Sequence, residues 1–113
     1  MGRIYKILTR AEWAEAEATG LFAGSAVDLA DGFIHFSTGV QAAETARRYF
    51  AGQPDLVVLE LEADDLGEAL RWEPSRGGDL FPHLYSSLAV SRVLAVTEAP
   101  LDADGLPTLG VLA

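Results

Sequence analysis

The chain has 113 residues, 50% of them hydrophobic, and a formal net charge of -9. The hydrophobic fraction is too high for a chain that is disordered as a whole. The negative charge makes the protein a poor partner for nucleic acid or an anionic membrane. No apolar run approaches the roughly 20 residues of a transmembrane helix, and the absence of cysteine excludes disulfides, zinc–thiolate sites and iron–sulfur clusters. We expect one cytoplasmic domain over residues 1–113, with a core at about 4–98 and a C-terminal extension at 99–113.

The first predicted elements are a strand and a helix. Residues 4–8, IYKIL, alternate around Lys6 as a short strand does. Thr9 and Glu12 have the spacing of a capping box, which predicts that a helix begins there. Gly20 suits the C-terminal cap of that helix.

A second strand and helix follow an irregular connection over residues 21–31, which has no regular hydrophobic period. Residues 33–37, FIHFS, alternate and predict a strand that carries His35 and Ser37 on one face. A second capping box then predicts a helix over residues 38–50.

The rest of the chain reads mainly as strands. Residues 55–62, DLVVLELE, give the clearest strand pattern, and residues 70–73, 80–85 and 91–99 predict further extended segments. The connections between these later strands are too short for helical crossovers, so we expect them to be antiparallel. The predicted fold class is therefore α+β, with two main helices and a largely antiparallel sheet.

The two histidines of the chain, His35 and His83, lie in similar settings, each among aromatic residues and near hydroxyl groups. His83 shares a strand face with Tyr85, and the two rings are suited to stack on a base or a sugar and to donate hydrogen bonds to it. The alternative for each histidine is a structural role in packing. If strand alternation places both histidine side chains on the same side of the sheet, the two imidazoles open onto one hollow lined by positive charge.

Ser37 and Thr38 stand where the second helix is predicted to begin. The N-terminus of a helix favours phosphate or carboxylate, although capping alone also accounts for both hydroxyls. Cationic side chains flank these segments, and the candidates for holding an anion are Lys6, Arg71 and Arg76.

Familiar catalytic signatures are absent from the sequence. The histidines do not have the HxH, HxxxH or HExxH spacing of a metal site, so we predict no metal. There is no GxSxG elbow for a serine nucleophile and no glycine-rich phosphate loop of the Walker or Rossmann type.

Taken in order, the segments IYKIL–TRAEW, DGFIHFST, LVVLELE, LRWE and FPHLY–SSLAVSRV resemble a bacterial family of small proteins known as Domain of Unknown Function 952. The resemblance covers roughly residues 4–98, and GFIHFST and FPHLY are its most specific pieces. The family is grouped with the ADP-ribosyltransferase-like proteins. That grouping implies a small, split, mixed sheet around a cleft that holds NAD in relatives.

The same resemblance implies roles for individual residues. Lys6 matches the first-strand position that contacts the dinucleotide, and Ser37 with Thr38 matches the hydroxyl-bearing second strand. The catalytic glutamate of the superfamily has no secure counterpart, and Glu60 and Glu98 are candidates by strand position alone. The missing glutamate favours binding over catalysis.

The leading hypothesis is therefore a binding module for a small anionic ligand such as a nucleotide or NAD-like metabolite, with NAD as a candidate ligand or cofactor. One alternative is an active ADP-ribosyltransferase-like or NAD-processing enzyme, and another is a structural or protein-interaction domain without a ligand. The candidate catalytic residues are His35 and His83. The candidate ligand-binding residues are Lys6, Ser37, Thr38, Arg71, Arg76 and Tyr85.

Overall fold

The computed structural model describes residues 2–110 and residue 112, together with their side chains except that of Arg76. The helices are α1 (Arg10–Thr19), α2 (Ala26–Asp31) and α3 (Gly39–Tyr49), with short 3-10 helices η1 (Ala63–Ala69), η2 (Arg76–Gly78) and η3 (Val90–Arg92). The strands are β1 (Arg3–Thr9), β2 (Leu21–Phe22), β3 (Ile34–His35), β4 (Ser37–Thr38), β5 (Leu56–Glu62), β6 (Leu70–Pro74), β7 (Leu80–Leu84), β8 (Leu88–Ala89) and β9 (Ala95–Glu98).

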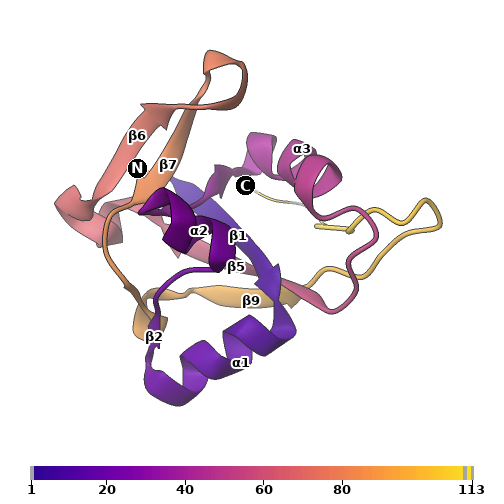
Figure 1. Cartoon of the computed structure of the whole chain (residues 1–113), viewed down its shortest axis with the longest axis horizontal. Helices are drawn as coiled ribbons and strands as arrows, with labels where there is room; N and C mark the ends of the chain where they lie inside the picture. Colours follow the sequence, from indigo (N-terminus) through magenta and orange to yellow (C-terminus); the bar gives the residue numbers. More distant parts are fainter. Residues whose placement is uncertain (1, 111, 113) are drawn as a thin grey trace.

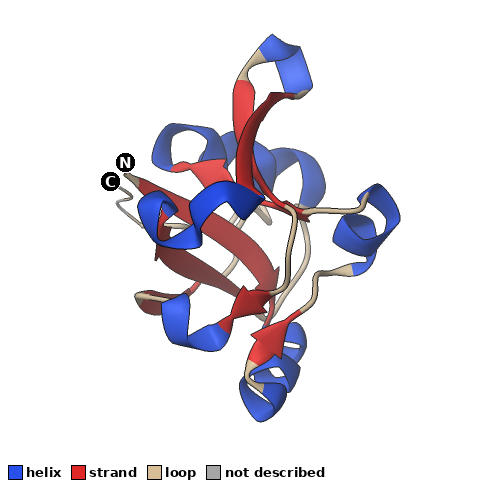
Figure 2. Ribbon diagram, turned by 90° about the vertical axis from the view of Figure 1, so that its left-hand side faces the viewer, coloured by secondary structure: helices blue, strands red, loops and turns tan. Residues whose placement is uncertain are grey.

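The strands form three sheets, with the orders β4-β1-β5-β9, β3-β7-β6 and β2-β8. Within the described part of the chain, all paired strands run antiparallel. The predicted α+β class with largely antiparallel pairing is thus confirmed. The mixed sheet that the family resemblance implies is not found, because no strand pair among the described residues is parallel. The β6–β7 hairpin projects away from the rest of the molecule (Figures 1 and 2). Helices α1 and α3 pack on opposite faces of the four-stranded sheet.

The two central strands of the four-stranded sheet, β1 and β5, are buried on both faces, which explains the near-continuous apolar run of β5. One face contributes to a cluster with α1 and the three-stranded sheet, whose buried members include Ile4, Leu8, Trp13, Ile34, Leu59 and Leu84. The other face packs beneath α3 through Tyr5, Ile7, Ala46, Leu56, Val58 and Ala99. Leu109 and Leu112 pack on this second cluster, so the C-terminal extension contributes to the core.

Both predicted capping boxes are present. The Thr9 hydroxyl accepts from the backbone N–H of Glu12 at 3.1 Å, and the Glu12 carboxylate accepts in return from the backbone N–H of Thr9 at 2.9 Å. Thr38 and Gln41 make the equivalent pair at the start of α3. These reciprocal bonds satisfy backbone donors that a helix start leaves without partners.

The expectation of an irregular loop over residues 21–31 is wrong, because this segment contains β2 and α2. The start of α2 is fixed by Asp28, whose Oδ2 accepts from the backbone N–H of Ser25 at 2.9 Å. A six-residue helix shows too little hydrophobic periodicity to be detected in a sequence. The Ser-x-x-Asp spacing was the local signal that was available.

Two predicted strands are also interrupted. Residues 33–37 divide into β3 and β4, which belong to different sheets, and between them the backbone N–H of Phe36 donates to the carbonyl of Pro82 at 3.0 Å. The last predicted strand, 91–99, shortens to β9 because the chain first makes the turn of η3. Among the described residues, no helix is both long enough and apolar enough to span a bilayer.

Candidate functional site

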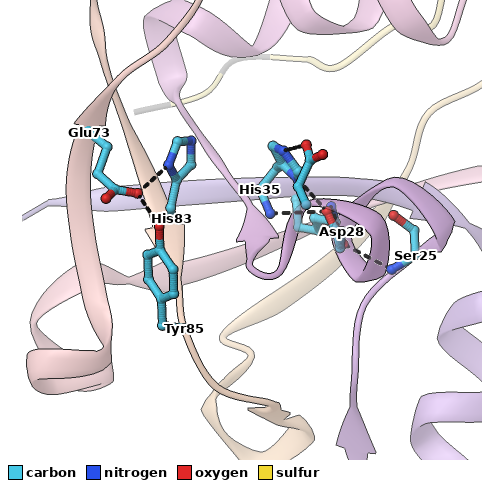
Figure 3. A network of polar contacts seen from close by, with 8 residues as sticks. Ser25, Asp28, His35, Glu73, His83 and Tyr85 are labelled. Atoms are coloured by element: carbon cyan, nitrogen blue, oxygen red, sulfur yellow. Dashed lines mark hydrogen bonds and ion pairs between the residues drawn. The ribbon is translucent and has the colours of Figure 1, made fainter.

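His35 and His83 lie opposite each other on the paired strands β3 and β7. Their ring centroids are 5.6 Å apart, and both rings project from the same face of the three-stranded sheet (Figure 3). By the two-residue period of a strand, the same face also carries Glu73 on β6 and Tyr85 just after β7. The register of two distant segments therefore builds one cluster of ionisable groups.

Asp28, on α2, is the centre of the contacts around His35. Its Oδ1 lies 2.6 Å from His35 Nδ1 and accepts from the His35 backbone N–H at 3.1 Å. Lys6 Nζ lies 3.0 Å from Oδ1 and 2.8 Å from Oδ2 of the same carboxylate. The second ring nitrogen of His35, Nε2, lies 2.9 Å from Oδ2 of Asp31. Both nitrogens of His35 are thus engaged by carboxylates of α2 (Figure 3).

The Lys6–Asp28 pair is buried, with side-chain exposures of 6% and 1%. Burial alone would raise the pKa of Asp28, but the hydrogen bond from His35, the charge of Lys6 and the Ser25 amide together hold it well below its usual range. The pKa of Lys6 is lowered by burial, and the attraction of Asp28 opposes that effect. Lys6 projects on the same face of β1 as Ile4 and Leu8, where an unpaired charge would be costly.

Glu73 plays the corresponding part for His83. Its Oε1 lies 2.8 Å from His83 Nδ1 and accepts from the Tyr85 hydroxyl at 2.7 Å. These hydrogen bonds, first from Tyr85 and then from His83, lower the pKa of Glu73. The bond to Glu73 in turn raises the pKa of Tyr85. Each histidine is therefore oriented by a carboxylate from a different element.

Phe33 lies against both imidazoles. Its ring centroid is 4.1 Å from that of His83, in a stacked arrangement, and 4.6 Å from that of His35. Phe33 and Tyr85 line a small hollow of about 230 Å³ that is separate from the main cavity. Phe33 is thus stacked on the His83 ring and tilted against the His35 ring.

The main cavity has a volume of about 580 Å³ and is lined by both histidines. β1 pairs with β4 only at Ile4 and Tyr5, and the cavity follows β1 beyond that pairing, along Lys6, Ile7 and Thr9. α2 and α3 supply further walls. The aromatic members of the lining are Tyr5, Phe36, Tyr49, Phe50 and Phe81.

Four of the residues singled out in the sequence line this cavity: Lys6, His35, Ser37 and His83. Thr38, Arg71 and Tyr85 do not line it, and the side chain of Arg76 lies outside the described residues. The Arg71 guanidinium sits over the Tyr85 ring, 4.9 Å from its centroid. Thr38 is accounted for by the cap of α3.

The charge of the cavity differs from the positive lining expected. Lys6 is neutralised by Asp28, and the described lining adds the carboxylates Glu12 and Asp31 but no arginine. Local alternation predicted a strand around Lys6, but it gave no information about the acid that pairs with this side chain. Asp28 and Glu73 were missed by sequence reasoning for the same reason, since each meets its histidine only in the folded chain.

The two candidates for a catalytic glutamate are engaged elsewhere. Glu60 pairs with Arg3 at 3.1 Å, and Glu98, whose side chain is 75% exposed, pairs with Arg10 at 2.6 Å. Neither lines the cavity. Within the described part of the chain, no group of three or more histidine or carboxylate side chains is arranged to hold a metal ion.

Comparison with known proteins gives a family and a fold. The family described as "Protein of unknown function (DUF952)" matches residues 7–96. The X-ray crystal structure of protein CC0527 from Caulobacter crescentus is 62% identical and superposes with a TM-score of 0.94, covering 96% of this chain and 95% of that chain. Its solution NMR structure gives a TM-score of 0.88 at 62% identity, covering 97% of this chain and 95% of that chain. No curated protein matches the chain.

Proposed function

The chain belongs to the DUF952 family, whose description assigns no activity, and from the site itself we propose that it is a small-molecule-binding protein with its ligand in the cavity beside His35 and His83. One observation carries this proposal. The His83 side chain is only 6% exposed and lines the cavity, yet its Nε2 has no hydrogen-bond partner among the described residues. A polar atom kept in a nearly buried ring and turned toward a cavity is what a ligand site provides.

The size and walls of the cavity support the same proposal. A volume of about 580 Å³ falls within the range of small-molecule sites, which is roughly 300–1,000 Å³. The aromatic walls and the few convergent polar groups are also typical of such sites, because ring faces bind a flat ligand and polar atoms orient it. A nucleotide or NAD-like metabolite, the ligand class predicted from the sequence, has both a flat ring and polar groups.

An ADP-ribosyltransferase-like enzyme is the second candidate. It shares the ligand class but needs a carboxylate beside the reacting ribose. Because Glu60 and Glu98 lie away from the cavity, the described residues favour binding over that reaction. The remaining alternative, a structural domain, gives no reason for a cavity that reaches both histidines.

Binding is tested by titrating the protein with NAD, ADP-ribose and adenosine while histidine resonances are followed by NMR. The matched variants are Val27→Trp, which places a large ring on the cavity wall, and Leu29→Trp, which changes the same helix outside the cavity. Both positions are exposed, at 57% and 66%, so neither substitution should disturb the core. We expect binding to be lost in Val27→Trp and retained in Leu29→Trp.

Two results would decide against this function. If none of the three ligands shifts either histidine, the structural alternative replaces binding. If both variants bind like the unmodified protein, the ligand occupies another surface. Nicotinamide released during prolonged incubation with NAD would instead establish the enzyme.

A further inference from the structure

We infer that the His83 end of the cavity recognises a hydrogen-bond donor, namely a hydroxyl or an ammonium group, and not an anion. This inference rests on the proposed function and specifies the chemistry of its ligand. It departs from the anionic ligand that the sequence suggests. Four structural observations lead to it.

The first observation fixes the tautomer of His83. Glu73 Oε1 meets both the Tyr85 hydroxyl, at 2.7 Å, and His83 Nδ1, at 2.8 Å. An ionised carboxylate only accepts hydrogen bonds, so His83 Nδ1 must carry the proton that it shares with Glu73. In the neutral ring the other nitrogen, Nε2, then holds a lone pair and acts as an acceptor.

The second observation concerns Ser37, which also lines the cavity. Ser37 Oγ lies 2.9 Å from Thr45 Oγ1, and either hydroxyl can be the donor. Ser37 is the donor in that contact when the Thr45 hydroxyl donates to the backbone carbonyl of Gln41, 3.2 Å away. In either arrangement the Ser37 oxygen keeps a lone pair that can accept a hydrogen bond from a ligand.

The third observation is that the described cationic side chains in and beside the cavity already have partners. Lys6 Nζ lies within 3.0 Å of both oxygens of Asp28, and His35 has a carboxylate at each ring nitrogen. Arg71 is placed over Tyr85 and does not line the cavity. An anionic ligand would therefore meet Lys6 only beside the carboxylate that already neutralises it.

The fourth observation is the sign of the nearby charge. The lining includes Asp31 and Glu12, and Asp28 lies directly behind Lys6. These carboxylates repel a phosphate and attract an ammonium group, and the aromatic walls also favour a cation over an anion. A neutral hydroxyl avoids the repulsion and can donate to the same acceptors.

The tautomer is measured without any ligand. In protein labelled with 15N, long-range correlation between ring protons and ring nitrogens shows which nitrogen carries the proton at about pH 8, where an imidazole is ordinarily neutral. We expect Nδ1 of His83 to be protonated and Nε2 to be bare. Tyr85→Phe should keep this tautomer because Glu73 remains, whereas Glu73→Leu should release it.

The ligand class is tested with three small probes, ribitol, ethylammonium and inorganic phosphate, added at matched ionic strength. We expect ribitol or ethylammonium to shift the His83 Nε2 resonance saturably, with phosphate at least about tenfold weaker. The two donor probes distinguish a hydroxyl site from an ammonium site. Their effect should disappear in Val27→Trp and persist in Leu29→Trp.

Three outcomes would overturn the inference: a proton on Nε2 of His83 at about pH 8, saturable phosphate binding at that nitrogen, or no response to either donor probe. The second outcome leaves the proposed function intact, because the cavity would still bind a ligand. Loss of all binding to the cavity, including that of NAD, ADP-ribose and adenosine, would instead remove the proposed function itself.

Discussion

His35 and His83 face each other across paired strands, and each is held by a carboxylate from a third element, Asp28 on α2 for His35 and Glu73 on β6 for His83. The two histidines differ in whether a ring nitrogen remains available to a ligand. His35 has carboxylates at both ring nitrogens, whereas His83 presents Nε2 to the cavity. His35 therefore anchors α2 to the sheet, and His83 is the imidazole suited to meet a ligand.

The buried Lys6–Asp28 pair makes a prediction about stability. Replacing one partner removes the lysine–carboxylate pairing from a buried setting and leaves the other charge there, so Lys6→Met and Asp28→Asn should each lower the free energy of unfolding by about 3–5 kcal/mol. The double variant should lose clearly less than the sum of the two. Urea denaturation of the four proteins checks this. Strictly additive losses would show that Lys6 and Asp28 are not coupled. The control is Glu44→Gln, which removes a charge from an exposed ion pair on α3 and should leave the urea transition unchanged.

The lowered pKa of Asp28 predicts a loss of stability in acid. A carboxyl group whose pKa is depressed in the folded state contributes stability above its unfolded value, about 3.9, and this contribution disappears as the pH falls through the lower folded value. The denaturation midpoint should therefore drop between about pH 5 and about pH 2. Asp28→Asn, already less stable at neutral pH, should show a shallower dependence over the same interval. Parallel curves for the two proteins would contradict this assignment.

The Glu73–Tyr85 hydrogen bond predicts the titration of a phenol. The bond to ionised Glu73 raises the pKa of Tyr85, so Glu73→Gln should bring it back toward the ordinary value of about 10. NMR titration of the Tyr85 ring resonances in the two proteins measures the change. An unchanged Tyr85 titration in Glu73→Gln would mean that the bond is not formed in solution.

The cap of α3 predicts a smaller and purely structural effect. Thr38→Ala removes the hydroxyl that accepts from the backbone N–H of Gln41, and should lower the free energy of unfolding by about 1 kcal/mol. Thr38→Ser keeps the acceptor oxygen and should lose much less. Thermal unfolding followed by circular dichroism compares the two. Equal losses would show that packing of the methyl group, and not capping, is the contribution of Thr38.

The sequence by itself determined the elements that depend on neighbouring residues. The capping boxes at Thr9 and Thr38 fixed where α1 and α3 begin, because their hydrogen bonds join residues three positions apart. The apolar run of β5 and the short connections after it determined the antiparallel class. Strand alternation correctly placed His83 and Tyr85 together, and the segments around both histidines identified the family.

Only the tertiary structure decided the chemistry of the site. Whether Lys6 meets a ligand or an acid depends on Asp28, which reaches it from a helix that the sequence did not reveal. Whether two imidazoles share a cavity depends on the register of β3 against β7, and which nitrogen of His83 is left for a ligand depends on Glu73 across the hairpin. Contacts between distant segments leave no periodic signal in the chain, so the charge and the hydrogen-bonding character of the cavity are properties of the fold.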